Sequence, residues 1–218
     1  MTDPVVSIEA LAKQFRSGGE TVTVFRKLDL TLGEGESLAL MGPSGSGKST
    51  LLNLLSGLDT WSAGQIRLFG EPLTGADEAR WSELRRDAIA TVFQEANLMP
   101  AMTLAENLRL RAGLAGRELP DAETWLRDLG LAGLGNRYPD QVSGGQRQRA
   151  ALAMAFAMQP RLILADEPTG SLDRRTAARV ADTLFRFQRQ YRCPLILATH
   201  DPELAERCDR CFSLDQQG

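Results

Sequence analysis

The nine residues from position 42 to 50 constrain the fold of this chain more than any other stretch. They read Gly42-Pro43-Ser44-Gly45-Ser46-Gly47-Lys48-Ser49-Thr50 and fit the phosphate-binding pattern G-x-x-x-x-G-K-[ST]. An apolar run, 37–41, leads into this loop, and a helix-like run, 50–55, leads out. The glycines allow backbone N–H groups to turn inward as an anion nest, and the helix start adds the positive end of its dipole. The stretch therefore predicts a phosphate site between a strand and a helix of an α/β core.

The lysine and the hydroxyl that end this loop have expected roles in holding a nucleotide. Lys48 should reach the β- and γ-phosphates, and the Ser49 hydroxyl should bind Mg²⁺. Two acids, Asp166 and Glu167, follow the apolar run 161–165, which is typical of a strand in the middle of a parallel sheet. Adjacent acids are costly to gather there unless a cation or a reacting group uses them. Asp166 is therefore the predicted metal ligand, and Glu167 is predicted to orient and polarise the attacking water.

Two further polar residues close apolar runs. Gln94 follows the run 90–93, and His200, the only histidine, follows 195–199. A lone histidine is more often structural, but its strand-end position favours a contact with the γ-phosphate. Because ligands bind at the carboxyl ends of parallel strands, we expect the loop, the acidic pair and these two residues to gather at one edge of the sheet.

Composition limits the class of protein. The 218 residues suit one α/β domain with a modest insertion, and 43% of them are hydrophobic. The net charge of −3 argues against a nucleic-acid partner bound through a basic face. No apolar run approaches the ~18 residues of a membrane span, and the first residues have no signal architecture. A soluble, cytosolic protein that reaches a membrane only through a partner is expected.

Three cysteines are too few for a disulfide framework. Cys208 and Cys211 form a single C-x-x-C pair, whereas Cys193 stands apart. The pair could be redox-active or half of a zinc site, but no second pair exists. We interpret it as two small, semi-apolar residues near the last strand.

The hydrophobic pattern predicts an α/β fold with an N-terminal antiparallel part and a mostly parallel sheet. Strands are expected over 5–11, 21–32, 37–41, 65–69, 90–93, 161–165, 194–199 and 211–214, and helices over 50–57, 81–87, 103–129, 142–158 and 174–190 and from 202. We predict that about 95–141 is a helical subdomain inserted into an α/β core made of 1–94 and 142–218, within a single domain.

The run Ser143-Gly144-Gly145-Gln146 identifies the family that the chain resembles. No other P-loop class places S-G-G-Q between the phosphate loop and the acidic strand end, and the chain is similar over essentially its whole length to ATP-binding subunits of ABC transporters. Gln94 matches that family's Q-loop, the run 171–173 its D-loop, and His200 its switch histidine. Phe15 falls where the family stacks an aromatic ring on adenine.

The resemblance implies a set of functional residues, with ATP and Mg²⁺ as cofactors. Catalysis is expected from Lys48, Gln94, Glu167 and His200, and metal binding from Ser49, Gln94 and Asp166. Nucleotide binding is expected from Phe15, the loop 42–50, the signature Ser143-Gly144-Gly145-Gln146 and Asp173.

The signature also implies partners. Ser143 and its glycines open a helix and form a second anion site that cannot face its own phosphate loop. In the family, two subunits meet head to tail, and each signature closes on the other subunit's ATP. The resemblance therefore implies a homodimer that sandwiches ATP, integral-membrane permease subunits as partners, no nucleic acid, and a peripheral location on the cytoplasmic face of the inner membrane.

Further stretches are similar to the lipoprotein-release and macrolide-export branch of the family, so export or release of a lipoprotein, a lipid-like or a drug-like substrate is expected. The alternative is an ATPase that regulates a membrane partner in cell division. Soluble family members of translation or DNA repair usually carry two ATPase domains or long insertions, which this chain lacks. After the Q-loop, an apolar surface is offered by Leu98, Met99, Pro100, Met102 and Leu104. Most of these side chains are expected to pack internally, and one or two of them to line a groove for a cytoplasmic helix of the membrane partner.

Overall fold

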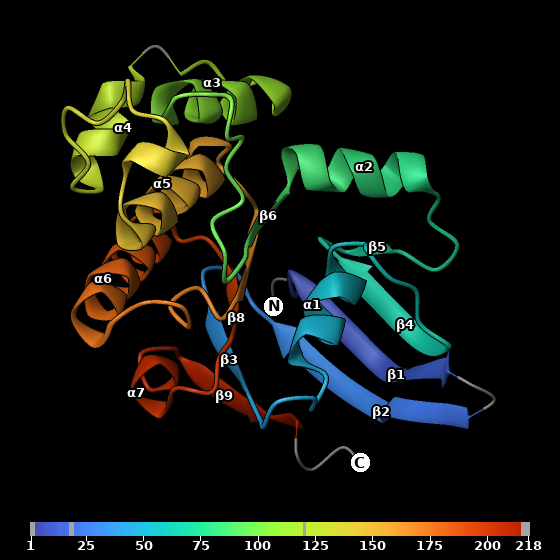
Figure 1. Cartoon of the computed structure of the whole chain (residues 1–218). Coiled ribbons are helices and arrows are strands. Elements are labelled where there is room, and N and C mark those ends of the chain that lie inside the picture. The colour runs from blue at the N-terminus through green and yellow to red at the C-terminus, as the bar shows by residue number, and fades with distance from the viewer. Residues whose placement is uncertain (1–2, 18–19, 120, 215–218) are drawn as a thin grey trace.

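The chain folds around two β-sheets. The structure is a computed structural model that describes residues 3–17, 20–119 and 121–214 (Figure 1). The antiparallel sheet has the order β2-β1-β4-β5, and the parallel sheet has the order β6-β7-β8-β3-β9. The antiparallel strands are β1 (Val6–Ser17), β2 (Glu20–Leu32), β4 (Ala63–Leu68) and β5 (Glu71–Pro72). The parallel strands are β3 (Ser37–Met41), β6 (Ile89–Val92), β7 (Leu162–Asp166), β8 (Leu195–Ala198) and β9 (Arg210–Ser213).

Helices cover both faces of the parallel sheet. They are α1 (Lys48–Leu55), α2 (Glu78–Asp87), α3 (Leu104–Leu114), α4 (Ala122–Asp128), α5 (Gly144–Ala157), α6 (Arg174–Tyr191) and α7 (Pro202–Ala205), with a short 3-10 helix at Pro139–Gln141. In Figure 1, α5 and α6 lie on one side of this sheet, and α1 and the antiparallel sheet lie on the other. Among the described residues, no helix is both long and apolar enough to cross a bilayer.

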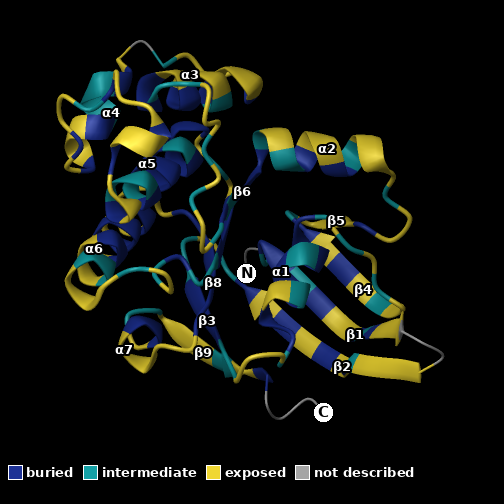
Figure 2. Ribbon diagram, viewed as in Figure 1, coloured by how far each residue is buried: buried dark blue, intermediate teal, exposed yellow. Residues whose placement is uncertain are grey.

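The parallel sheet is buried on both faces, which explains the continuous apolar runs of its strands. On β7, Ile163 packs into the core formed with α3 to α6, whereas Leu162 and Leu164 pack into the core formed with α1 and the antiparallel sheet. Successive side chains of a strand point to opposite faces, so each strand must be apolar at every position. Figure 2 shows the buried strands at the centre of the molecule. The predicted α/β fold with both kinds of sheet is confirmed.

Strand ends are the main difference from the sequence-based expectation. The first strand was expected to end at residue 11, but β1 continues to Ser17 because it pairs with β2 on one side, as in Phe15 opposite Val22. Residues 21–32 were expected as a strand and lie in one continuous strand, β2, which pairs antiparallel with β1. The short strand β5 was not predicted.

The starts of α3, α5 and α6 lie within two residues of the predicted positions, whereas α2 begins at Glu78, three residues before the predicted start, because the Asp77 side chain caps it. Thr103 and Ser143 each form a capping box with the residue three positions later, and Asp121 and Asp173 cap α4 and α6. The segment 95–141 shares one continuous hydrophobic core with α5, α6 and the parallel sheet. Its proposed boundaries as an inserted subdomain stay a prediction.

The expected apolar surface after the Q-loop is only partly at the surface. Leu104 is fully buried in the core under α3, so it is not one of the residues that could line the groove: as the first residue of the helix it faces inward. Leu98 also packs partly against this core. Met99 is 52% exposed and remains the main apolar side chain of this surface.

We predict that Gly145→Ala destabilises the protein through the contact between α5 and α6. A Cβ atom at this position would overlap with Cγ2 of Thr176, so the free energy of unfolding should fall by about 1–3 kcal/mol. Urea denaturation measures the change. The neighbouring Gly144→Ala is the control, because its Cβ would lie no closer than 3.7 Å to any atom. Adding Thr176→Ser, which removes Cγ2, should recover most of the lost free energy of unfolding. If none is recovered, the assigned contact between position 145 and Thr176 is wrong.

We predict that thiol alkylation distinguishes the three cysteines. Burial raises the pKa of the Cys193 thiol and of the Cys208 thiol to about 12, whereas Cys211 is exposed. At pH 8, roughly one in ten thousand of the buried thiols would be the reactive thiolate. Iodoacetamide followed by mass spectrometry should label Cys211 first in the folded protein and all three in denaturant. Equal labelling in the folded state would contradict the described burial.

Candidate active site

The phosphate loop lies between β3 and α1, and its geometry requires glycine at position 47. Gly47 has φ +98° and caps α1, accepting a hydrogen bond from the Leu51 N–H at 2.8 Å. A Cβ atom here would lie 2.6 Å from Val24 Cγ1 and 2.8 Å from the Phe25 ring. No other residue has both the left-handed backbone and the missing side chain that this turn needs.

The interior of the loop is built for an anion. Lys48 is buried, and its ammonium group donates hydrogen bonds to the carbonyl oxygens of Gly42 at 2.7 Å and Pro43 at 3.0 Å. The Ser46 hydroxyl is buried and has no hydrogen-bond partner among the described residues. A buried cation and an unpartnered hydroxyl beside a helix N-terminus fit a phosphate group.

A single cavity of about 760 Å³ lies at the edge of the sheet where the site residues were expected to gather. It brings together most of the predicted site residues from five separate stretches. Its lining is Phe15, Val24, Ser44, Gly45, Gly47, Lys48, Ser49, Thr50, Gln94, Asp166, Glu167 and His200. Phe15 is 41% exposed, and the Lys13 ammonium lies over its ring, 4.3 Å from the centroid. Val24 was not predicted; it is one apolar residue among several in its strand, and nothing in the sequence singles it out.

Glu167 is at the centre of the charged part of the cavity. Its Oε2 lies 2.7 Å from His200 Nδ1, and its Oε1 lies 4.0 Å from Lys48 Nζ. Its backbone has φ +43°, which is unusual for a residue with a side chain, and its N–H is held by the carbonyl of Ala198 at 2.9 Å. A left-handed residue held by the neighbouring strand is the kind of local strain found at functional sites.

Asp166 has the environment of a metal ligand. Burial raises the pKa of its carboxyl, the neighbouring Glu167 charge raises it further, and a hydrogen bond from Ser49 and the charge of Lys48 act in the opposite direction. A cation at this point would favour the charged carboxylate. The described residues contain no cluster of three or more His, Cys, Asp or Glu side chains suited to a metal ion.

The signature residues lie outside this cavity. Ser143 and Gln146 form the capping box of α5, with Ser143 Oγ accepting from the Gln146 N–H at 3.3 Å, and Asp173 caps α6. Neither these residues nor Gly145 line the cavity. Gly144 lines a neighbouring hollow of about 380 Å³, which it shares with Gln94. The exposed start of α5 thus presents a second helix N-terminus to the surrounding solvent.

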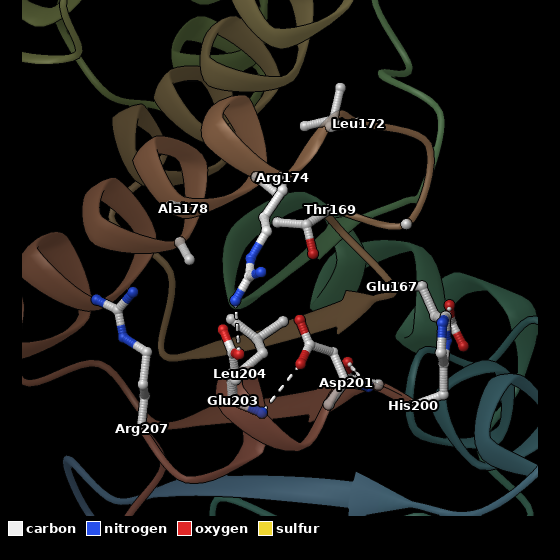
Figure 3. A pocket seen from close by; sticks show the side chains of 14 residues that line it. Glu167, Thr169, Leu172, Arg174, Ala178, His200, Asp201, Glu203, Leu204 and Arg207 are labelled. Atoms are coloured by element: carbon white, nitrogen blue, oxygen red, sulfur yellow. Dashed lines mark hydrogen bonds and ion pairs between the residues drawn. The ribbon is translucent and has the colours of Figure 1, made fainter.

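A further cavity of about 470 Å³ lies on the other side of the Glu167–His200 pair (Figure 3). It runs between the start of α6 and the helix α7, where Arg174 Nη2 pairs with Glu203 Oε1 at 3.0 Å. Because Glu167 and His200 line both cavities, the pair separates them and can be reached from two directions.

Comparison with known proteins agrees with this site. The family model described as "ABC transporter" matches residues 25–170. The chain is 42% identical over 214 residues to an uncharacterized ABC transporter ATP-binding protein, YbbA, of Escherichia coli (strain K12), covering 96% of this chain and 94% of that one. It is 44% identical over 216 residues to the lipoprotein-releasing system ATP-binding protein LolD of Anaeromyxobacter dehalogenans (strain 2CP-C), covering 97% and 90%.

A solved structure of a related cassette gives the same result. A dimeric ATP-binding cassette in a post-hydrolysis state, bound to ADP and Pi, superimposes with a TM-score of 0.86 at 33% identity, covering 95% of this chain and 93% of that one. Both the sequence similarity and the shared fold extend over nearly the whole chain. The chain therefore belongs to the ABC transporter family, as one of its ATP-binding and ATP-hydrolysing cassettes.

Proposed function

We propose that two copies of this chain close head to tail around two ATP molecules and drive a membrane permease. The observation that carries this proposal is the separation of the two phosphate sites in one chain. The start of α5 with Ser143 lies outside the cavity that contains Lys48 and Glu167. A signature that cannot serve its own nucleotide can serve that of a second copy, and the related cassette is a dimer.

ATP binding is assigned to the loop, its lysine and Phe15. The backbone N–H groups at the start of α1 and the Lys48 ammonium would bind the phosphates. The Phe15 ring, exposed at the cavity, would stack on the adenine. Mg²⁺ would be held by Ser49, Asp166 and Gln94. When bound, Mg²⁺ would neutralise charge on the β- and γ-phosphate oxygens.

Hydrolysis is assigned to Glu167 and His200. Glu167 would orient the water and accept a proton from it, while the water oxygen forms a bond to the γ-phosphorus and the bond between that phosphorus and the ADP oxygen breaks. The products are ADP and inorganic phosphate. His200, held against Glu167 Oε2, would contact the γ-phosphate and keep the carboxylate in place. Release of the products would reopen the dimer.

The membrane role is proposed from the relatives. The LolD relatives are named as ATP-binding proteins of lipoprotein-releasing systems, which supports release of a lipoprotein or lipid-like substrate by the permease partner. The chain would then act at the cytoplasmic face of the inner membrane. Met99, exposed beside the buried Leu104, would be the centre of the permease-binding surface.

We predict that Glu167→Gln separates ATP binding from turnover. The amide keeps the shape of the side chain but cannot accept a proton, so kcat should fall about 100-fold or more while ATP still binds. Without hydrolysis the closed dimer should accumulate. Size-exclusion chromatography with light scattering, with and without ATP, measures this directly. A variant that stays monomeric with ATP at high protein concentration and still hydrolyses ATP would refute the assigned role of Glu167.

The matched control for this experiment is Lys48→Ala. Its ammonium is the buried cation of the loop, so its loss should weaken ATP binding itself and give no dimer with ATP. Fluorescence titration with a labelled ATP analogue distinguishes the two variants. If both bind ATP equally well, Lys48 is not part of the phosphate site.

We predict that Met99→Glu prevents binding of the permease without affecting ATP hydrolysis by the isolated subunit. A charge at the centre of an apolar docking surface is costly to bury, whereas in the free subunit this side chain is already half exposed. Pull-down from detergent-solubilised membranes with mass spectrometry measures the bound permease. Leu114→Glu, an equally exposed leucine at the end of α3, is the control. Equal loss in both variants, or an unfolded Met99→Glu protein, would contradict the assignment.

A further inference from the structure

A buried glutamine connects the signature helix to the residue before Gln94. Gln148 lies in the second turn of α5 and is 2% exposed. Its Nε2 donates a hydrogen bond of 2.7 Å to the carbonyl oxygen of Phe93. A buried amide is retained only where it has partners, and this contact is short for an N–H···O bond. Gln148 therefore fixes the point where the chain leaves β6.

The next carbonyl of the chain is also held. Ser171, in the loop that leads into α6, donates from Oγ to the carbonyl oxygen of Gln94 at 3.3 Å. The Gln94 side chain itself lines the nucleotide cavity beside Glu167. The Gln94 backbone is thus held from one side by the signature helix and from the other by the D-loop.

The segment 93–99 is held at its other end by a second buried side-chain amide, that of Asn107. Asn107 of α3 accepts a hydrogen bond from the Met99 N–H at 2.7 Å, and its Nδ2 donates to the carbonyls of Met99, Met102 and Thr103 at 3.2, 3.1 and 3.0 Å. Between these two fixed points, Gln94, Glu95 and Asn97 are exposed. The segment 94–99 is thus a short connection that is held at both ends, with Gln94 at one end and the exposed Met99 at the other.

We propose that Gln148 is a positioning residue for ATP hydrolysis. Its hydrogen bond to Phe93 makes Gln94 move together with the start of α5, so that a shift of the signature helix also moves Gln94 at the catalytic site of the same chain. The inference rests on the proposed role of Gln94 and adds the residue that sets its position. Catalysis is sensitive to such placement, since a shift of about 1 Å can cost two orders of magnitude in rate.

The test compares Gln148→Met with a matched control, Gln188→Met, in the full chain. Gln188 of α6 is 3% exposed and donates from Nε2 to the carbonyls of Gly35 and Cys193, at 2.9 and 3.2 Å. These partners lie near the amino ends of β3 and β8, away from the catalytic edge. Both variants lose buried hydrogen bonds of the same kind, so a purely structural effect on stability should appear in both.

We expect Gln148→Met to lower kcat about tenfold or more, with the KM for ATP changed less than twofold, and to speed amide hydrogen exchange in 93–99. Gln188→Met should keep kcat and the exchange of 93–99 near those of the unmodified protein. Equal kcat values for the two variants, or unchanged exchange in 93–99, would overturn the proposal. If Gln148→Met does not fold, Ser171→Ala removes the other anchor at an exposed site and should lower kcat in the same way; an unchanged kcat there would overturn the proposal.

These outcomes are distinct from a failure of the proposed function. If the unmodified chain showed no ATP hydrolysis, the proposed ATPase mechanism would fail, but the exchange of 93–99 would still report whether Gln148 holds this segment. If hydrolysis is present and sensitive to Glu167→Gln but not to Gln148→Met, the ATPase stands and the positioning role is wrong.

Discussion

The site depends on the parallel pairing of β3, β7 and β8. Because these strands run in the same direction and lie next to one another, the residues that follow them meet at one edge of the sheet. The phosphate loop follows β3, the acidic pair ends β7, and His200 follows β8. If one of these strands were antiparallel, its polar residue would lie at the opposite edge, far from the phosphate loop.

This sheet is buried on both faces, so burial alone does not fix the register of its strands. Side chains of β7 and β8 fill two separate cores, one under α3 to α6 and one against α1 and the antiparallel sheet. A slip of one residue would still leave apolar side chains on both faces, so hydrogen bonds at the ends add specificity. The Glu167 N–H to Ala198 carbonyl contact at 2.9 Å is one of them, and it also holds the left-handed backbone of the proposed catalytic carboxylate.

Three successive parts of the helix α5 make different contributions to the structure. Its first residues carry the exposed signature, Gln148 in its second turn holds the carbonyl before Gln94, and its later residues, such as Leu152 and Phe156, fill the core. A rigid helix moves all three together. This arrangement would connect closure of the proposed dimer to the candidate catalytic site, and the segment from Gln94 to Met99 would extend the connection toward the proposed permease surface.

The sequence by itself determined the local chemistry. The phosphate loop, the acidic pair and the helix start at Ser143 were predicted, because each depends on residues close together in the chain. The end of β1 and the inward direction of Leu104 were not, since these depend on partners distant in sequence.

Distance along the chain also explains which contacts only the tertiary structure decided. Val24 in the cavity wall, the pairing of His200 with Glu167, and the bond from Gln148 to Phe93 join residues far apart in the chain. Neither periodicity nor a motif encodes such pairs. The pairing of β7 with β8 and the packing of β2 and α5 against the parallel sheet select them.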